Sequence, residues 1–333
     1  MNTLPTNCVH TLSGHKGAIL CGCFSSTGSY CFTGGMDQTI RLWNPLKGTS
    51  IFTFEGCHNK EVLGVAVDGL NATFASAGAD KRVYVWDLQT TKSKVFFRGH
   101  ESRVTCVSFG ADNSILMSGS FDKTVRLWDM RSRTFTPIQI LDDAKDGITH
   151  VESRGTSLFT GSTDGFLRAY DVRMGKMIAD DLHEPITSFA VSHDGNCYLA
   201  SARGGTLRLV DRTDGRVLNR YRGHLHVQYN VQCSFLTDDA FVACGSEDGS
   251  VFVWDLVTAE IATVLRGHTS ICSSLSFCKC RELENIPLMM STSADGTARI
   301  LSNFEFNEKR EKLAEAEKRV APFMETRLRI PLL

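Results

Sequence analysis

Residues 119–129, with the sequence GSFDKTVRLWD, decide the fold, because variants of this stretch recur along the chain. Each copy has a small residue, a turn with Asp or Gly, a run that alternates as a β-strand does, and an aromatic or apolar closing residue. The other copies are GGMDQTIRLWN at 34–44, AGADKRVYVWD at 77–87, GSTDGFLRAYD at 161–171, RGGTLRLVD at 203–211, GSEDGSVFVWD at 245–255 and SADGTARILS at 293–302. The closing positions are Trp43, Trp86, Trp128, Tyr170, Val210, Trp254 and Leu301, at spacings of 43, 42, 42, 40, 44 and 47 residues. Seven copies at this period predict an all-β fold, a propeller of seven blades with four strands each.

A second marker, Gly-His, precedes several copies, at Gly14-His15, Gly99-His100, Gly223-His224 and Gly267-His268, with Cys57-His58 as a variant. Together the two patterns resemble the WD40 family over about residues 8–302. The resemblance implies a buried hydrogen-bonded network in each blade, formed by a His, a strand Ser or Thr, a turn Asp and the Trp. The matching positions are His15, Thr33, Asp37 and Trp43; His58, Ser76, Asp80 and Trp86; His100, Ser118, Asp122 and Trp128; and, in part, His224, Asp248 and Trp254.

Four blades depart from this network. Blade four lacks the His, and blade five has Gly204 where the Asp belongs. Blade six has Cys244 at the Ser or Thr position, and blade seven has Leu301 in place of Trp. A buried Asp or Trp N–H without a partner costs on the order of 1–3 kcal/mol. We therefore expect these blades to depend more on apolar packing.

The ends of the repeat region predict how the ring closes. The last copy ends its third strand near Ser302, and no fourth strand follows it. Residues 8–12 (CVHTL), before the first Gly-His, have the character of an outer strand. We expect them to complete blade seven, which would leave no exposed sheet edge between the two chain ends. The propeller domain is thus predicted to cover residues 8–302.

The segment 303–333 has a different composition. Residues 305–320 are rich in helix formers and carry favourable i,i+4 pairs of opposite charge, so they predict a charged C-terminal helix. Pro322 ends this helix, and the rest is expected to be a flexible end.

Composition excludes several function classes. With 36 Lys and Arg against 37 Asp and Glu, the net charge is −1, so direct nucleic-acid binding is not expected. No apolar run reaches the 18 or so residues that span a membrane, and the first ten residues have no secretory signal. We therefore expect a cytoplasmic and nuclear protein, a monomeric propeller within larger complexes, with its 12 cysteines free.

The chain carries no motif typical of catalysis. Phosphate-binding, nucleophile-elbow and zinc-protease motifs are all missing. Cys21 and Cys23 form a Cys-x-Cys pair, but Gly64 and Ala66 stand at the matching positions of blade two, which indicates crowding at the propeller axis rather than a metal site. The pair Cys278 and Cys280 is expected in a longer loop, where packing and metal binding both stay open. We expect no enzyme activity, no cofactor and no metal.

Loops on a rigid scaffold are where binding residues concentrate. The residue before each turn Asp and the neighbouring loops between blades are predicted to lie on one face. Aromatic and arginine side chains are common interface anchors. The candidate partner-binding residues on this loop face are Arg103, Phe121, Arg203, Tyr229 and Glu247, and the alternative is an ordinary mixed surface.

Two short motifs suggest particular partners. Asp129-Met130-Arg131 and Asp171-Val172-Arg173 resemble the double Asp-x-Arg box of substrate receptors that dock a cullin-RING ubiquitin ligase adaptor. The alternative is that each arginine makes a salt bridge within its own blade. The C-terminal Arg327, Arg329, Ile330 and Leu332 resemble a docking peptide for mitogen-activated protein kinases, although a tail folded onto the propeller explains them equally well.

A closer resemblance rests on longer stretches. They are WNPL at 43–46, WDMRSR at 128–133, LDDAKDG at 141–147, YDVRMG at 170–175, PIT at 185–187, TLRLVD at 206–211 and SEDGSVFVWDLV at 246–257. Together they look like the mitogen-activated protein kinase organizer family, over about residues 10–300, while the tail after Ser302 does not. This resemblance implies a non-catalytic scaffold for kinase-cascade components that is also a spliceosome-associated subunit. The alternative function is a substrate receptor of a cullin-RING ligase.

Overall fold

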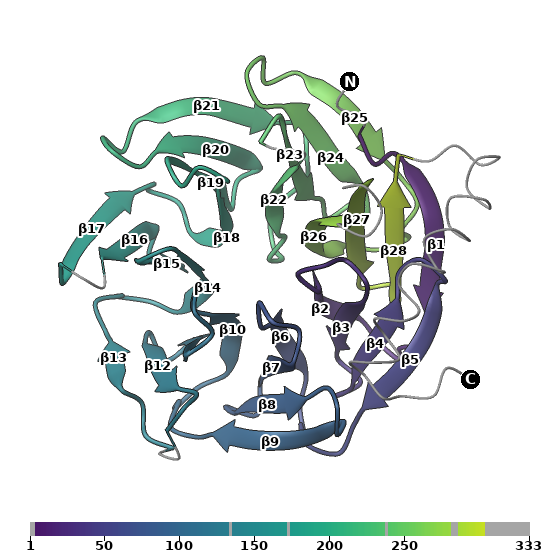
Figure 1. Ribbon diagram of the computed structural model, residues 1–333. Helices are drawn as coiled ribbons and strands as arrows, with labels where there is room; N and C mark the ends of the chain where they lie inside the picture. The colour runs from purple at the N-terminus through teal and green to yellow at the C-terminus, as the bar shows by residue number, and fades with distance from the viewer. Residues whose placement is uncertain (1–3, 133–134, 172–173, 237–238, 281–285, 304–333) are drawn as a thin grey trace.

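In the computed structural model the chain forms a ring of seven four-stranded antiparallel sheets around a central axis (Figure 1). The structure describes residues 4–132, 135–171, 174–236, 239–280 and 286–303. Within these residues every regular element is a β-strand, and no helix long and apolar enough to cross a membrane is present. The prediction of an all-β, seven-bladed propeller is confirmed.

The first four blades follow the chain in order, with the inner strand of each first. Blade one has β2 (Ile19–Phe24), β3 (Cys31–Gly35), β4 (Ile40–Asn44) and β5 (Thr49–Phe54). Blade two has β6 (Val62–Val67), β7 (Thr73–Gly78), β8 (Val83–Asp87) and β9 (Lys92–Phe97). Blade three has β10 (Val104–Phe109), β11 (Ile115–Ser120), β12 (Val125–Asp129) and β13 (Gln139–Leu141). Blade four has β14 (Ile148–Arg154), β15 (Ser157–Ser162), β16 (Phe166–Asp171) and β17 (Lys176–Asp181).

The last three blades continue the same plan. Blade five has β18 (Ile186–Val191), β19 (Cys197–Ala202), β20 (Thr206–Asp211) and β21 (Val217–Arg222). Blade six has β22 (Cys233–Leu236), β23 (Phe241–Gly245), β24 (Val251–Asp255) and β25 (Ile261–Leu265). Blade seven has β26 (Cys272–Cys280), β27 (Ile286–Ser293) and β28 (Thr297–Ser302), and its outer strand is β1 (Asn7–Ser13).

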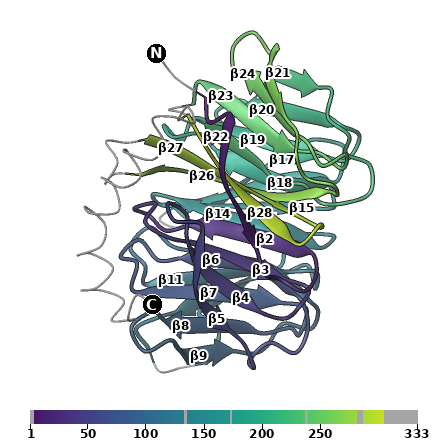
Figure 2. The ribbon, with the colours of Figure 1, turned by 90° about the vertical axis from the view of Figure 1, so that its right-hand side faces the viewer.

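Strand β1 closes the ring as predicted. It pairs antiparallel with β28, from Asn7 opposite Ser302 to Ser13 opposite Thr297. Viewed from the edge of the ring, β1 runs along the rim beside β28 (Figure 2). The first and last strands of the repeat region are thereby held in one sheet, which leaves blade seven with the same four strands as its neighbours.

Aromatic residues join one blade to the next. Phe54 at the end of β5 packs on Trp86 of blade two, with ring centroids 5.3 Å apart, and Trp86 stacks on Phe74 at 5.7 Å. In the same way Phe97 at the end of β9 stacks on Trp128 of blade three at 4.7 Å. Because the repeat places these side chains at each blade boundary, the apolar core runs between the sheets around the ring.

The ring has two faces. One, the loop face, carries the connections between blades and the turns between second and third strands. The opposite face carries the connections from first to second and from third to fourth strands.

Candidate interaction surface

Blades one to three each contain the predicted four-residue network. In blade one the His15 ring lies 2.9 Å from an Asp37 oxygen through Nδ1 and 2.8 Å from the Thr33 hydroxyl through Nε2, and Trp43 donates its indole N–H to Thr33 at 2.8 Å. The same contacts join His58, Ser76, Asp80 and Trp86, and His100, Ser118, Asp122 and Trp128.

The donors in this network follow from its chemistry. The indole N–H of Trp43 can only donate, so the Thr33 oxygen accepts from it and its own hydrogen goes to Nε2 of His15. Nδ1 of His15 is then protonated and donates to Asp37. Burial lowers the pKa of His15 in spite of the adjacent carboxylate. Burial alone would raise the pKa of Asp37, but the Lys16 N–H and His15 lower it. The network is therefore a neutral imidazole between two fixed partners, and it holds the turn of the loop face rigid.

Blade seven retains three members of the network. His268 contacts Asp295 at 3.1 Å and the Ser291 hydroxyl at 2.9 Å, while Leu301 occupies the Trp position and packs between the sheets. The loss of Trp therefore removes one donor without disturbing the imidazole.

Blade six differs from the pattern that its His, Asp and Trp suggest. Trp254 donates to the backbone carbonyl of Arg222 at 3.0 Å, and neither ring nitrogen of His224 has a hydrogen-bond partner among the residues that the structure describes. Asp248 accepts from the backbone N–H of Ser250 instead of from His224. The physical reason is Cys244, which brings no hydroxyl to the point where the other blades join Trp and His.

Blades four and five use arginine where histidine is missing, although we expected apolar packing there. Arg168 of β16 donates to Asp164 at 2.7 and 3.2 Å, and both side chains are about 95% buried. Arg208 at the matching position of β20 pairs with Glu184 at 2.8 Å and also donates to the Leu182 carbonyl. A buried ion pair in blade four and a partly exposed one in blade five therefore replace the histidine network.

The predicted loop-face residues fall into two groups rather than one cluster. In blade three the guanidinium of Arg103 lies over the ring of Phe121, 4.3 Å from its centroid, and both side chains are exposed. Arg103 borders a hollow of about 440 Å³ that is also lined by Met36, Lys60, Glu61 and Lys81. The lining of the hollow has three cationic side chains and one carboxylate, and it offers an apolar contact through Met36, which is half exposed.

The second group belongs to blades five and six. One oxygen of Glu247 accepts the backbone N–H groups of Val227, Gln228 and Tyr229 at 2.8, 2.6 and 2.8 Å. Burial would raise the pKa of Glu247, but these three donors lower it. The loop thus held presents three exposed apolar side chains, Leu225, Val227 and Tyr229.

Arg203 joins this second group through the loop before β22. Its neighbour Gly204 donates its backbone N–H to the carbonyl of His226 at 3.0 Å, and Arg203 itself is exposed. Sequence reasoning did not select Lys60, Lys81, Leu225 or Val227. Their positions could have identified them, because they lie in the connections between blades or in the turns, and the repeat predicts that both lie on the same face.

The structure describes only part of the double Asp-x-Arg box and none of the C-terminal docking motif. Arg131 lies 3.6 Å from Asp112 of its own blade, with both side chains largely exposed, and its backbone N–H binds Asp129. This is the local salt bridge that we gave as the alternative to ligase docking. Asp171 ends β16, while Arg173 and the tail residues Arg327, Arg329, Ile330 and Leu332 lie outside the described residues, as does the predicted helix.

No group of three or more His, Cys, Asp or Glu side chains in the described ranges has an arrangement that could hold a metal ion. All eleven cysteines whose side chains are described are free thiols, and burial raises the pKa of seven of these thiols well above its ordinary value.

Comparison with known proteins gives consistent matches. A family model described as "WD domain, G-beta repeat" matches residues 6–44, 48–87, 91–129, 215–255 and 259–302. WD repeat domain-containing protein 83 of Rattus norvegicus is 41% identical over 82% of this chain and 87% of the relative. The protein of that name from Xenopus tropicalis is 42% identical over the same shares, and a homolog from Dictyostelium discoideum is 30% identical over 80% of this chain and 90% of the relative. Blades four and five, which use arginine pairs, lie in the gap between the matched segments.

Proposed function

The chain belongs to the WD40 repeat family and is a relative of WD repeat domain-containing protein 83, and we propose that it is a non-catalytic scaffold that holds protein partners on its loop face. WD40 propellers generally bind other proteins. The observation that carries the proposal is that the exposed anchors of the loop face are already fixed before a partner arrives. Arg103 rests on Phe121, and Glu247 ties down the loop of Tyr229.

Preorganisation of this kind favours binding. A partner that meets a rigid aromatic or arginine side chain does not have to order it, so less of the contact energy is lost as conformational entropy. The buried histidine networks make the turns of blades one, two, three and seven rigid as well. The two groups on blades three and five to six are separate, so the face offers positions for more than one partner segment.

The resemblance to the mitogen-activated protein kinase organizer family supports two partner classes. They are components of a kinase cascade and protein subunits of the spliceosome. The proposal places the protein in both cytoplasm and nucleus. With a net charge of −1, contact with RNA would run through these protein partners.

The first experiment identifies the partners. The tagged full-length protein is purified from cell lysate with and without nuclease, and the proteins that accompany it are identified by mass spectrometry. Splicing factors that persist after nuclease treatment would support the spliceosomal role, and kinase-cascade components would support the signalling role. Recovery of neither class would overturn both partner assignments.

The second experiment tests the loop face. Arg103→Glu combined with Phe121→Ala removes the first group, and Tyr229→Ala removes the exposed ring of the second. We expect each variant to lose a subset of partners at unchanged stability, because all three side chains are exposed. Val257→Ala is the matched control, since Val257 is 82% exposed but lies between β24 and β25 on the opposite face. If all partners persist in both loop-face variants, the loop face is not the scaffold surface.

A further inference from the structure

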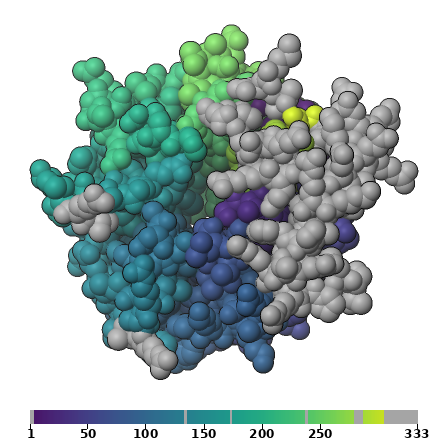
Figure 3. Space-filling view, in the orientation of Figure 1, coloured from purple at the N-terminus to yellow at the C-terminus, as the bar shows by residue number. Residues whose placement is uncertain are grey.

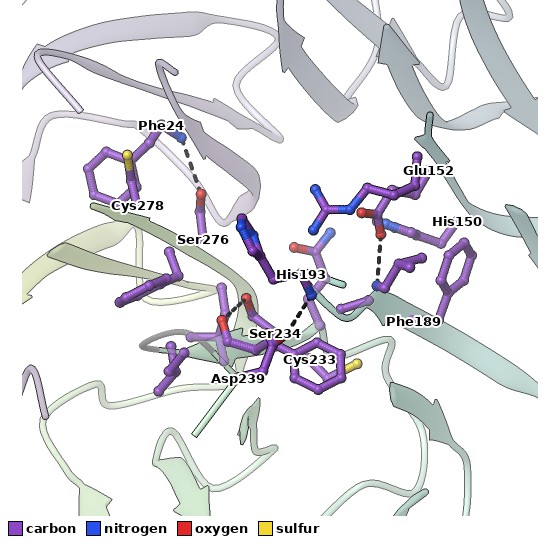
Figure 4. Close-up of a pocket in the computed structure, with 18 of the residues that line it drawn as sticks. Phe24, His150, Glu152, Phe189, His193, Cys233, Ser234, Asp239, Ser276 and Cys278 are labelled. Carbon is purple, nitrogen blue, oxygen red and sulfur yellow. Dashed lines mark hydrogen bonds between the residues drawn. The ribbon is translucent and has the colours of Figure 1, made fainter. Parts of the chain in front are cut away.

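The central channel opens into a cavity of about 790 Å³ on the face opposite the loop face. Figure 3 shows this face of the ring. The lining comes from the inner strands of blades one, four, five, six and seven and from the connections that follow them. Figure 4 shows Glu152 and His150 of β14 on one side of the cavity and Ser276 and Cys278 of β26 on the other.

Blade four departs from the other blades at this cavity. Equivalent positions of the inner strands are identified by the residue that each faces on the second strand of its blade. His150 of β14 faces Gly161, as Cys21 of blade one faces Gly34, so His150 and Cys21 are equivalent. Five other blades have a small residue at this position, namely Cys21, Gly64, Cys106, Ser188 and Ser274. Blade six has the uncharged Gln232 there, whose carbonyl accepts the backbone N–H of Gly245, while Cys233 stands opposite Cys244. Two residues beyond His150, Glu152 stands where all six other blades have a small residue: Cys23, Ala66, Ser108, Ala190, Ser234 and Ser276. The other blades thus place uncharged residues at these two positions near the axis, and blade four places two ionisable groups there instead.

The two carboxyl groups of the cavity outnumber its single arginine, Arg154, and neither forms an ion pair with it at contact distance. Glu152 accepts one hydrogen bond, from the backbone N–H of Val191 at 3.2 Å, and Asp239 accepts one from the backbone N–H of His193 at 2.5 Å. Neither forms an ion pair with any residue in the described part of the chain. Arg154, on the same strand face as Glu152, donates to the carbonyl of Ser192. Burial raises the pKa of Glu152 to about 7 and also raises the pKa of Asp239, and the attraction of Arg154 offsets this effect of burial only in part.

The remaining lining is aromatic and neutral. Phe24, Phe189, Phe235 and Phe277 border the cavity. The ring of His150 meets Phe189 edge-on, with centroids 5.0 Å apart at 86°, and burial lowers the pKa of this imidazole to about 4. His150 is therefore neutral at pH 7 and supplies no charge to Glu152. Carboxylates beside aromatic faces are the surroundings that suit an organic cation.

We propose that this cavity binds the side chain of a lysine or arginine presented by a protein partner, with Glu152 and Asp239 as counter-charges. An ammonium or guanidinium group would give the carboxylates an ion pair at contact distance, which Arg154, bound to the Ser192 carbonyl, does not form with them. An anion would meet two carboxylates and one arginine, so it does not fit the charge of the lining. The site lies on the opposite face and goes beyond the proposed loop-face function.

The test uses capped single amino acids as probes of the full-length protein. N-acetyl-arginine methylamide and N-acetyl-lysine methylamide are titrated by ligand-observed NMR, with N-acetyl-citrulline methylamide as the neutral match in shape. We expect the cationic probes to bind about tenfold more tightly than the citrulline probe, since only they form the charge-assisted hydrogen bonds. Equal binding of the citrulline probe, or preference for N-acetyl-glutamate methylamide, would overturn the proposal.

Two variants place the binding at Glu152. Glu152→Gln keeps the shape and removes the charge, and it should weaken the arginine probe about tenfold. The pair His150→Ser with Glu152→Ala gives β14 the residues that β18 has in Ser188 and Ala190, and it should lose the probe while remaining folded. Glu55→Gln, which removes an exposed carboxylate from the connection between blades one and two, is the control and should bind as the native protein does. Unchanged binding in Glu152→Gln would overturn the proposal even if the paired variant fails to fold. Because the probes replace the partner, the outcome is independent of the loop-face test.

Discussion

Arg168 donates two hydrogen bonds to Asp164 in blade four, at 2.7 and 3.2 Å, and thereby takes the place of the missing histidine. Asp164 also accepts the backbone N–H of Lys145, as Asp37 of blade one accepts that of Lys16. The turn carboxylate therefore has the same function in both blades, which is to bind the connection from the preceding blade. Only its side-chain donor has changed from an imidazole to a guanidinium.

The first prediction concerns this ion pair. Arg168→Met leaves Asp164 as an uncompensated buried charge, so we expect the free energy of unfolding to fall by about 3–5 kcal/mol. The control is Arg131→Met, which removes an exposed salt bridge to Asp112 and should cost about 1 kcal/mol or less. Urea denaturation followed by tryptophan fluorescence measures both. Equal losses in the two variants would show that the buried pair contributes no more than a surface pair.

The second prediction concerns the hydroxyl that joins Trp and His. Ser118 contacts Nε2 of His100 at 2.8 Å and accepts from Trp128 at 2.9 Å, so Ser118→Ala leaves two buried groups without a partner. We expect a loss of about 2 kcal/mol or more. Ser108→Ala is the control, because Ala66 and Ala190 occupy its register position in blades two and five. In thermal unfolding, Ser118→Ala should melt at a clearly lower temperature than Ser108→Ala. Similar melting temperatures of the two variants would refute a structural role for the Ser118 hydroxyl.

Blade six allows the converse experiment. Cys244 stands at the position of Ser118, and both nitrogens of the nearby His224 lack a partner among the described residues. Cys244→Ser restores a hydroxyl there, and we expect a gain of about 1 kcal/mol in the free energy of unfolding. Ala243→Ser, one residue earlier on the other side of β23, adds a hydroxyl away from the network and should destabilise. A loss of the same size in both variants would contradict the expected repair.

Much of the fold could be predicted from the sequence because the repeat fixes both period and register. His15 and Asp37 are separated by 22 residues, as are His58 and Asp80, so the repeat located in these blades the residues of the network that the WD40 resemblance implies. Closure by the N-terminal strand followed from counting three strands in the last copy. These features depend on local sequence, which a repeat makes visible.

The arginine pairs could not be predicted in the same way. Arg41 occupies in blade one the strand position that Arg168 has in blade four, yet it lies over the ring of Trp43 at 5.9 Å. The same residue type therefore has different partners, depending on whether a histidine already binds the turn Asp. The division of the loop-face residues into two groups also depends on three-dimensional contacts, such as that of Arg103 with Phe121, which no periodic pattern contains.

The fourth prediction concerns the loop held by Glu247. Glu247→Ala removes the common acceptor of three backbone N–H groups, so hydrogen exchange of Val227, Gln228 and Tyr229 should accelerate. Because the loop is exposed, we expect a loss of global stability of only about 1–2 kcal/mol. Partners that require Tyr229 should bind less tightly, since they would have to order the loop. Unchanged exchange at these three amides would show that the loop is held by other contacts.

The fifth prediction concerns pH. Burial lowers the pKa of His224 to about 4, whereas the unfolded chain protonates its histidines near 6.5. Between these values the unfolded state binds more protons, so the stability contributed by neutral His224 is fully present above about pH 6.5 and is lost as the pH falls towards 4. His224→Leu removes this proton uptake. We therefore expect its stability relative to the native protein to improve as the pH is lowered from 7.5 to about 5, by on the order of 1–2 kcal/mol.

His183→Asn is the control, because His183 is largely exposed and asparagine accepts its positive φ of 62°. Urea titrations at several pH values measure how the free energy of unfolding of each variant depends on pH. If this dependence is the same for His224→Leu and the native protein, His224 is not the group that titrates.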